Sequence, residues 1–104
     1  VCSKVKKSNK IKSFWGDAFK SIKEIEDSKY DKIFVDLNDD QYCIDLAKKN
    51  MKGLKRILKK GGVILWHDYK PEAPDVFSYL NELASELPLR HISGTDFVIF
   101  QRAS

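Results

Sequence analysis

Short apolar runs rich in β-branched and aromatic residues alternate along this chain with longer segments in which apolar residues recur every three or four positions. Runs of the first kind are typical of strands, and segments of the second kind are typical of amphipathic helices. The predicted strands are residues 11–15, 32–37 and 63–67, and the predicted helices are residues 17–28, 41–60 and 75–87. Because strands that alternate with crossover helices form a parallel sheet, we predict an α/β fold.

Turn-forming and capping residues mark the ends of these elements. Asp17 is a good N-cap for the first helix, and Gly61-Gly62 predicts a left-handed end for the second. Gly53 lies inside the second helix, where it predicts close packing by another part of the chain. Two β-prone runs around Ser93-Gly94 predict a C-terminal antiparallel β-hairpin over residues 89–101.

The composition is that of a single globular domain. The chain has 104 residues, of which 42% are hydrophobic and 33% are charged. No apolar run approaches the ~20 residues of a membrane span, and the first ten residues do not resemble a signal peptide. Cys2 and Cys43 form no metal-binding or redox motif. We therefore expect a cytoplasmic protein without a membrane partner.

The net charge of +4 comes largely from basic residues on one predicted helix. They are Lys48, Lys49, Lys52, Lys55, Arg56, Lys59 and Lys60. A nucleic-acid platform would interleave aromatic residues with such charges, and none are interleaved here. We interpret the basic residues as the solvated face of an amphipathic helix and expect no nucleic-acid partner.

Polar and titratable residues follow each predicted strand. The first strand is followed by Gly16-Asp17-Ala18, the second ends in Asp36 before residues 38–40, and the third ends in His67-Asp68-Tyr69. Ligands of open parallel sheets bind beyond the carboxyl ends of the strands, so these groups are expected to share one rim. Carboxylates with an imidazole suit Mg²⁺ or another divalent cation.

Each of these groups also has a structural interpretation. Asp17 could serve only as a helix cap, and Asp39 and Asp40 are more typical of turn formers. Asp36, by contrast, ends a buried strand, where a carboxylate needs a partner, and the pair His67-Asp68 has the same position on the next strand. For these three we favour a functional role. His91, on the predicted hairpin, is expected to be an exposed or capped side chain.

Four segments in order resemble a known family. They are FWGDAF (14–19), YDKIFVDLND (30–39), LKRILKKGGVILWHDY (54–69) and HISGTDFVIFQR (91–102). Together they resemble the C-terminal half of class I S-adenosylmethionine-dependent methyltransferases, most closely the small-molecule branch whose fifth strand reads GGVI-x-x-HDY. The resemblance implies a partial Rossmann-like methyltransferase fold and methyl transfer from S-adenosylmethionine to a small-molecule acceptor.

The resemblance also implies roles for individual residues. Gly16, Asp17 and Ala18 match the place where such enzymes hold the adenine, and Asp36 matches the acidic residue near the methionine end of the cofactor. In metal-dependent members, the positions of Asp36, His67 and Asp68 form the catalytic metal site, with Mg²⁺ or another divalent cation. Such a cation would lower the pKa of an acceptor hydroxyl and aim its oxygen at the methyl group.

The chain departs from the family pattern after the second predicted strand. Relatives often read Asp-Gly-Asp-His-x-Tyr there, whereas this chain reads DLNDDQY, with Leu37 in place of the glycine and no histidine. Asn50 stands where an aspartate is common. Asn38 or Asp39 could replace part of the missing chemistry.

The family's first two strands, its G-x-G loop and its ribose-binding carboxylate would all precede residue 1. Residues 1–104 would then be a single α/β domain corresponding to the C-terminal part of the methyltransferase domain. A gap of two strands would separate the strands at 11–15 and 32–37. Three alternatives are open: a fragment of a longer enzyme, a homo-oligomer that completes the sheet, or direct pairing of the two strands. We favour the fragment, and expect this chain alone to be inactive and to bind S-adenosylmethionine weakly or not at all.

Two non-catalytic hypotheses compete with the methyltransferase. The run YDKIFVDLND also resembles receiver domains, in which an aspartate at a strand end accepts phosphate, although their acidic pair and lysine are not placed here. The other hypothesis is a methyltransferase-like unit kept for binding or dimerisation. It predicts that Asp36, His67 and Asp68 are held by internal hydrogen bonds.

Overall fold

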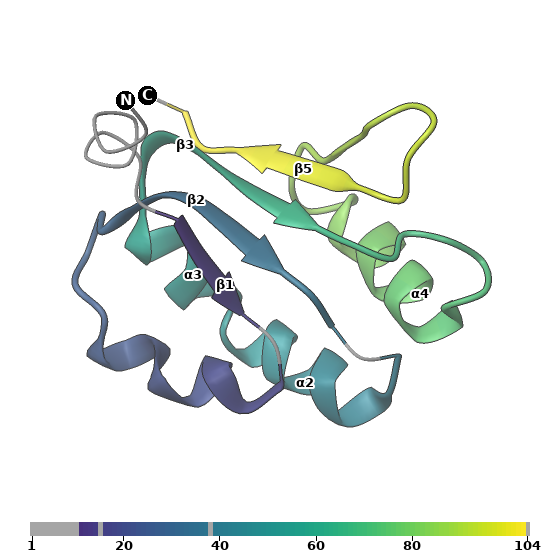
Figure 1. The fold of residues 1–104 in the computed structure, drawn as a ribbon, viewed down its shortest axis with the longest axis horizontal. Helices are drawn as coiled ribbons and strands as arrows, with labels where there is room; N and C mark the ends of the chain where they lie inside the picture. Colours follow the sequence, from purple (N-terminus) through teal and green to yellow (C-terminus); the bar gives the residue numbers. More distant parts are fainter. Residues whose placement is uncertain (1–10, 15, 38, 104) are drawn as a thin grey trace, which may run out of the picture.

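The computed structural model describes residues 11–14, 16–37 and 39–103, without the side chains of residues 16–18 and 20. Its strands form one five-stranded sheet in the order β1-β2-β3-β5-β4 (Figure 1). Their bounds are Ile11–Phe14 for β1, Tyr30–Val35 for β2, Leu58–Trp66 for β3, Arg90–His91 for β4 and Val98–Gln101 for β5. The strands β1, β2 and β3 are parallel, and β5 is antiparallel to both β3 and β4. The predicted α/β fold and the C-terminal hairpin are confirmed.

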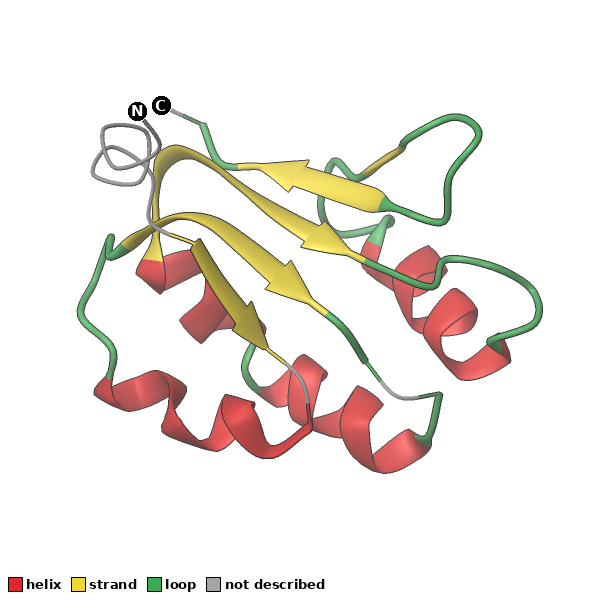
Figure 2. Cartoon of the chain, viewed as in Figure 1, coloured by secondary structure: helices red, strands yellow, loops and turns green. Residues whose placement is uncertain are grey.

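Four helical segments connect these strands (Figure 2). They are the 3-10 helix η1 at Gly16–Glu24 and the α-helices α2 at Gln41–Lys49, α3 at Met51–Ile57 and α4 at Pro74–Leu83. The close packing predicted at Gly53 is present, because a Cβ at that position would lie 3.2 Å from the side chain of Ile22 in η1. No helix in the described ranges is both long enough and apolar enough to cross a membrane.

The prediction of one helix over residues 41–60 is wrong in two respects. The helix is interrupted at Asn50, the C-cap of α2, and it ends at Ile57 because Leu58 already pairs with Tyr30 as the first residue of β3. Gly61 does adopt a positive φ of 80°, but it does so inside β3 rather than at a helix end. The glycine pair therefore shapes a strand and does not end a helix.

An irregularity in β3 accounts for the two glycines. Between the pairs Tyr30–Leu58 and Lys32–Val63, β3 advances by five residues while β2 advances by two. The backbone folds tightly at this bulge: a Cβ on Gly62 would lie 2.7 Å from the carbonyl oxygen of Asp31 and 2.8 Å from that of Lys59. Only glycine fits such an approach of backbone to backbone.

The gap of two strands expected from the family resemblance is absent from the structure. Strand β1 pairs directly with β2, in register from Ile11↔Lys32 to Phe14↔Val35. This direct pairing was the third of the alternatives raised by the sequence. The pairing gives hydrogen-bond partners to the backbone N–H and C=O groups of β1 and β2 that would lack them if a gap separated the two strands.

The two faces of the sheet differ in burial. One face carries side chains that are almost completely buried beneath the helices: Phe14, Ile33, Val35, Ile64, Trp66, Val98 and Phe100. Residues that alternate with them, such as Phe34, Leu65 and Ile99, are only half-buried. The core therefore lies between the sheet and one layer of helices.

Candidate functional site

The candidate site lies at the rim formed by the carboxyl ends of the parallel strands. Asp36 directly follows β2, and His67 and Asp68 directly follow β3. The parallel hydrogen bonding continues beyond the strand ends: the Asp36 amide donates to the Phe14 carbonyl at 2.9 Å, and the His67 amide donates to the Val35 carbonyl at 3.2 Å. These bonds fix the backbone of both residues, so their side chains emerge side by side.

The structure brings the three predicted residues together. His67 Nδ1 lies 3.1 Å from Asp68 Oδ1 and 4.0 Å from Asp36 Oδ1. One ligand atom from each of Asp36, His67 and Asp68 lies within 4.8 Å of the other two. The side chains are 43%, 36% and 27% exposed, respectively, so solvent and ligands reach them. We call these three residues the rim triad.

Asp68 adopts an unusual backbone conformation within the triad. Its φ is 65°, in the left-handed region that non-glycine residues rarely occupy and that aspartate tolerates better than most. The Lys70 amide donates to the Asp68 carbonyl at 2.9 Å, and Lys70 Nζ lies 3.7 Å from Asp68 Oδ1. Strained residues cluster at functional sites, so this conformation is a second reason to look for function here.

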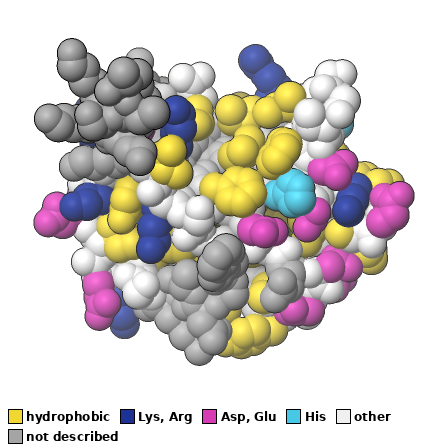
Figure 3. Space-filling view, in the orientation of Figure 1, with side chains coloured by type: hydrophobic (Ala, Val, Ile, Leu, Met, Phe, Trp, Pro, Cys, Tyr) yellow, Lys and Arg dark blue, Asp and Glu magenta, His cyan; other side chains and the backbone are white. Residues whose placement is uncertain are grey.

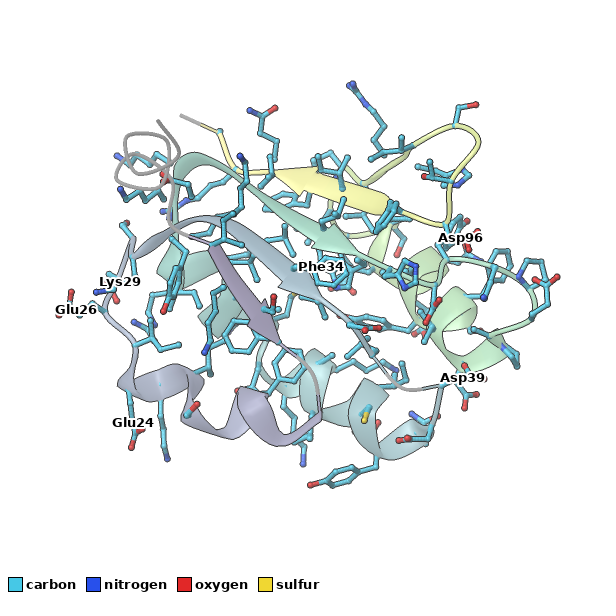
Figure 4. The ribbon with its side chains drawn as sticks, in the orientation of Figure 1. Glu24, Glu26, Lys29, Phe34, Asp39 and Asp96 are labelled. Atoms are coloured by element: carbon cyan, nitrogen blue, oxygen red, sulfur yellow. The ribbon has the colours of Figure 1, made fainter. Side chains whose placement is uncertain are left out.

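Two aromatic side chains that the sequence analysis did not single out flank His67. The ring centroids of Phe97 and Phe34 lie 5.0 Å and 6.3 Å from that of the imidazole. Phe34 lies near the centre of the sheet in Figure 4, and the labelled Asp96 lies beyond it, next to the start of β5. The alternation along β2 places Phe34 on the same side as Asp36, whereas Phe97 arrives from the distant hairpin. The triad thus has an apolar wall.

The residues predicted to hold the adenine follow β1. Gly16, Asp17 and Ala18 form the first turn of η1, at the same rim of the sheet, but their side chains lie outside the described set. Asn38 also lies outside the described residues. The roles of these residues stay predictions.

Asp39 and Asp40 are both helix caps. Asp40 Oδ1 accepts a hydrogen bond from the Cys43 amide at 2.8 Å and caps α2. Asp39 Oδ1 accepts hydrogen bonds from the amides of Asp75 at 2.8 Å and Val76 at 3.1 Å (Asp39 is labelled in Figure 4). Asp39 thus satisfies the first amides of α4 from 36 residues away and ties the loop after β2 to the helix after β3. The suggestion that Asp39 replaces missing catalytic chemistry is less favoured, because its carboxylate is engaged in this cap.

We expect Asp39→Ala to lower the free energy of unfolding by about 1 kcal/mol, because two amides at the start of α4 lose their acceptor. Urea denaturation followed by circular dichroism measures this change. Asp45→Ala is the matched control, since Asp45 is an aspartate on α2 that accepts a local side-chain bond from Gln41. Equal losses in the two variants would show that the cap contributes nothing.

Tyr69 and His91 have structural partners. The Tyr69 hydroxyl donates to Asn81 Oδ1 at 2.7 Å, and its ring stacks on Phe77 with centroids 4.8 Å apart. His91 is exposed, and its Nε2 lies 2.6 Å from the Thr95 carbonyl oxygen, in agreement with the prediction of an exposed or capped side chain. The chemistry of the rim therefore concentrates in Asp36, His67 and Asp68.

Comparison of the chain with models of known protein families finds a match to one family. The model of the spermine/spermidine synthase domain matches residues 1–86, a span that includes η1, the rim triad and all of α4. A search of the curated proteins found no match.

Proposed function

Because the chain belongs to the spermine/spermidine synthase domain family, which has the class I methyltransferase-like fold, we propose that it takes part in alkyl transfer from a sulfonium donor to a small molecule. The donor class is S-adenosylmethionine or its decarboxylated form. The group transferred would be a methyl group from the first donor and an aminopropyl group from the second. In either case the acceptor's nucleophilic atom bonds to carbon, the carbon–sulfur bond breaks, and the electron pair leaves on a neutral thioether.

The observation that carries the proposal is the rim triad. Its two carboxylates and one imidazole offer hard and borderline ligand atoms within 4.8 Å of one another, a set that suits Mg²⁺ or Mn²⁺. A divalent cation bound there would lower the pKa of an acceptor hydroxyl and hold its oxygen in line with the donor. In this proposal Asp36, His67 and Asp68 hold the cation, and solvent reaches it from the open side of the rim.

The surroundings of the triad also suit a positively charged donor. A sulfonium is a soft cation, and such cations are attracted both by carboxylates and by the faces of aromatic rings. The rings of Phe34 and Phe97 have their centroids 6.3 Å and 5.0 Å from that of the imidazole, and carboxylate oxygens of Asp36 and Asp68 lie 4.0 Å and 3.1 Å from its Nδ1. In the proposal, Asp36 faces the methionine end of the donor, and Gly16, Asp17 and Ala18 face its adenine.

The test maps weak ligands by amide NMR spectra of the ¹⁵N-labelled 104-residue chain. Mn²⁺ is added first, because it broadens the amide signals nearest its binding site. We expect the signals of residues 35–37 and 66–69 to broaden first, since these residues surround the triad. S-adenosylmethionine and its decarboxylated form are then titrated in separate samples, and we expect each to shift amide signals at the same rim.

The outcomes are distinct. Mn²⁺ broadening at the scattered surface carboxylates instead of the rim would remove the cation from the proposal. Because this chain is expected to bind S-adenosylmethionine weakly or not at all, both donors are titrated to high concentration, and shifts confined to amides away from the rim would overturn the proposed donor class. Transfer of phosphate to Asp36 by acetyl phosphate in the presence of Mg²⁺ would instead support the receiver-like alternative.

A further inference from the structure

A groove runs between two walls of helix on the helical side of the sheet. Helices α2 and α3 form one wall, and α4 with the residues that follow it forms the other. The groove has a narrow part of about 250 Å³ and a wide part of about 530 Å³. Both parts are lined by Lys48, Met51, Leu83 and Glu86, so they form one continuous space. The rim triad lies outside its lining, and spaces of this size between helices are common ligand sites.

The wide part has an apolar base and a basic rim. Its base consists of Met51, Leu83 and Leu87, which are buried or half-buried against the core. Its rim carries four exposed lysines and one glutamate, namely Lys48, Lys49, Lys52, Lys55 and Glu86. Apart from Lys48, these lysines form no ion pair with any residue that the structure describes. An excess of positive charge above an apolar base fits an anion that carries an apolar body.

The narrow part contains a buried hydroxyl without a hydrogen-bond partner. Tyr79 lines this part and is only 3% exposed. Within the described residues, its hydroxyl oxygen and the indole nitrogen of Trp66 are the buried side-chain polar atoms that make no hydrogen bond. Burial raises the pKa of the Tyr79 hydroxyl, and the neighbouring Trp66 indole opposes this rise only in part, so the hydroxyl stays protonated. Nearly all buried donors in proteins are paired, so this hydroxyl indicates an acceptor supplied by a ligand.

An ion pair joins the two walls beside this hydroxyl. Lys48 of α2 lies 3.7 Å from Glu82 of α4, and both side chains line the narrow part together with Tyr79. The two charged side chains are 44% and 69% exposed. Exposed pairs of this kind contribute little to stability. A ligand can therefore displace the pair at low cost and reach the phenol beneath it.

The groove differs in charge from the rim of the sheet. Asp36 and Asp68 contribute two carboxylates to the rim triad, and Figure 3 shows acidic side chains gathered around a histidine on the face opposite the helices. Such surroundings repel an organic anion, whereas the lysines of the groove attract it. The rim and the groove therefore suit ligands of opposite charge.

We propose that the groove binds an elongated organic anion that carries a hydrogen-bond acceptor at its far end. Its oxyanion lies among the lysines of the wide part, and its apolar body covers Met51 and Leu83. A carbonyl oxygen at the other end accepts a hydrogen bond from the Tyr79 hydroxyl in the narrow part. The inference goes beyond the proposed function, because no residue of the rim triad takes part in it.

Monomethyl suberate is the probe, because it has a carboxylate at one end, a chain of methylene groups and an ester carbonyl at the other end. Added to the ¹⁵N-labelled chain, it is expected to shift the amide signals of residues 48–55 and 79–87. Two matched ligands are titrated in separate samples. Decanoate has a chain of similar length and the carboxylate but no ester, whereas dimethyl suberate has two esters and no charge. The shifts give a dissociation constant for each ligand.

Tyr79→Phe tests the hydrogen bond. It is expected to weaken the binding of monomethyl suberate by about 3- to 10-fold, the effect of one neutral hydrogen bond. The affinity for decanoate should stay unchanged, because decanoate offers no acceptor to the phenol. The hydroxyl has no partner within the described residues, so its removal should not lower the free energy of unfolding, which chemical denaturation measures.

Lys52→Gln/Lys55→Gln tests the oxyanion and changes only exposed side chains. The double variant is expected to weaken the binding of monomethyl suberate and decanoate by at least about 3-fold at low salt, and by less as salt is added. It should leave dimethyl suberate unaffected. Lys23→Gln/Lys60→Gln is the matched control, because it removes the same charge from exposed lysines outside the groove and should bind all three ligands like the parent.

Three results would overturn the proposal. Monomethyl suberate that shifts no amide signal of residues 48–55 or 79–87 would exclude this class of ligand from the groove. Equal weakening of monomethyl suberate and decanoate by Tyr79→Phe would show that the hydroxyl does not bond to the ester. Equal losses of affinity in the two lysine double variants would reduce the effect of Lys52 and Lys55 to the net charge of the chain.

Discussion

Asp36→Asn is expected to weaken Mn²⁺ binding by at least about 100-fold, which is the largest functional effect that the site predicts. Changes to groups that merely orient metal ligands already cost up to this factor, and Asp36 is proposed as a ligand itself. The substitution keeps the shape of the side chain but removes one of the two carboxylates of the rim triad. Isothermal titration calorimetry with Mn²⁺ measures the change in affinity.

The matched control is Asp45→Asn, which removes the same charge from the exposed surface of α2. It should leave Mn²⁺ affinity unchanged. Asp36 is half-exposed, so Asp36→Asn should alter the free energy of unfolding by no more than about 0.5 kcal/mol. Unchanged Mn²⁺ affinity in a stable Asp36→Asn protein would show that Asp36 is not a ligand.

Gly62→Ala is expected to cause the largest loss of stability among the glycine substitutions, about 2–3 kcal/mol. The new methyl group would lie 2.7 Å and 2.8 Å from the carbonyl oxygens of Asp31 and Lys59. Because both contacts are with backbone, no change of side-chain rotamer relieves them, and the bulge of β3 has to move. Chemical denaturation of the purified variant measures the loss.

Gly94→Ala is the control, because it measures the cost of replacing a glycine of positive φ where no such clash occurs. Gly94 has a φ of 78°, but a Cβ there would have no neighbour within 4 Å. Only backbone strain then opposes the substitution, at a cost of about 1 kcal/mol. If Gly62→Ala proved as mild as Gly94→Ala, the close approach at the bulge would be refuted.

The sequence predicted the parts of the fold that depend on local pattern. The apolar runs of β2 and β3, rich in β-branched residues, identify both strands, and the parallel arrangement then brings Asp36, His67 and Asp68 to one rim. These predictions require only the two-residue alternation of side chains along a strand and the rule that strands joined by crossover helices lie parallel in one sheet. The triad could therefore be predicted without any tertiary information.

The features that the sequence analysis missed depend on contacts between distant segments. The helical periodicity over residues 41–60 continues into Leu58, but pairing with Tyr30 converts that residue to strand. Asp39 caps α4 only because the folded chain brings together residues 36 positions apart, and Phe97 reaches His67 only through the hairpin. No local pattern in the sequence carries this information.

The bulge in β3 has a consequence for changes in chain length. Residues 59–62 separate the paired residue Leu58 from the regular ladder that starts at Val63. Removing or adding one residue there would shift the rest of β3 by a single position, which exchanges its two faces. His67 would then turn toward the helices and Trp66 toward solvent, so the triad would be lost without any substitution within it. Only insertions or deletions of an even number of residues in this segment preserve the orientation of His67.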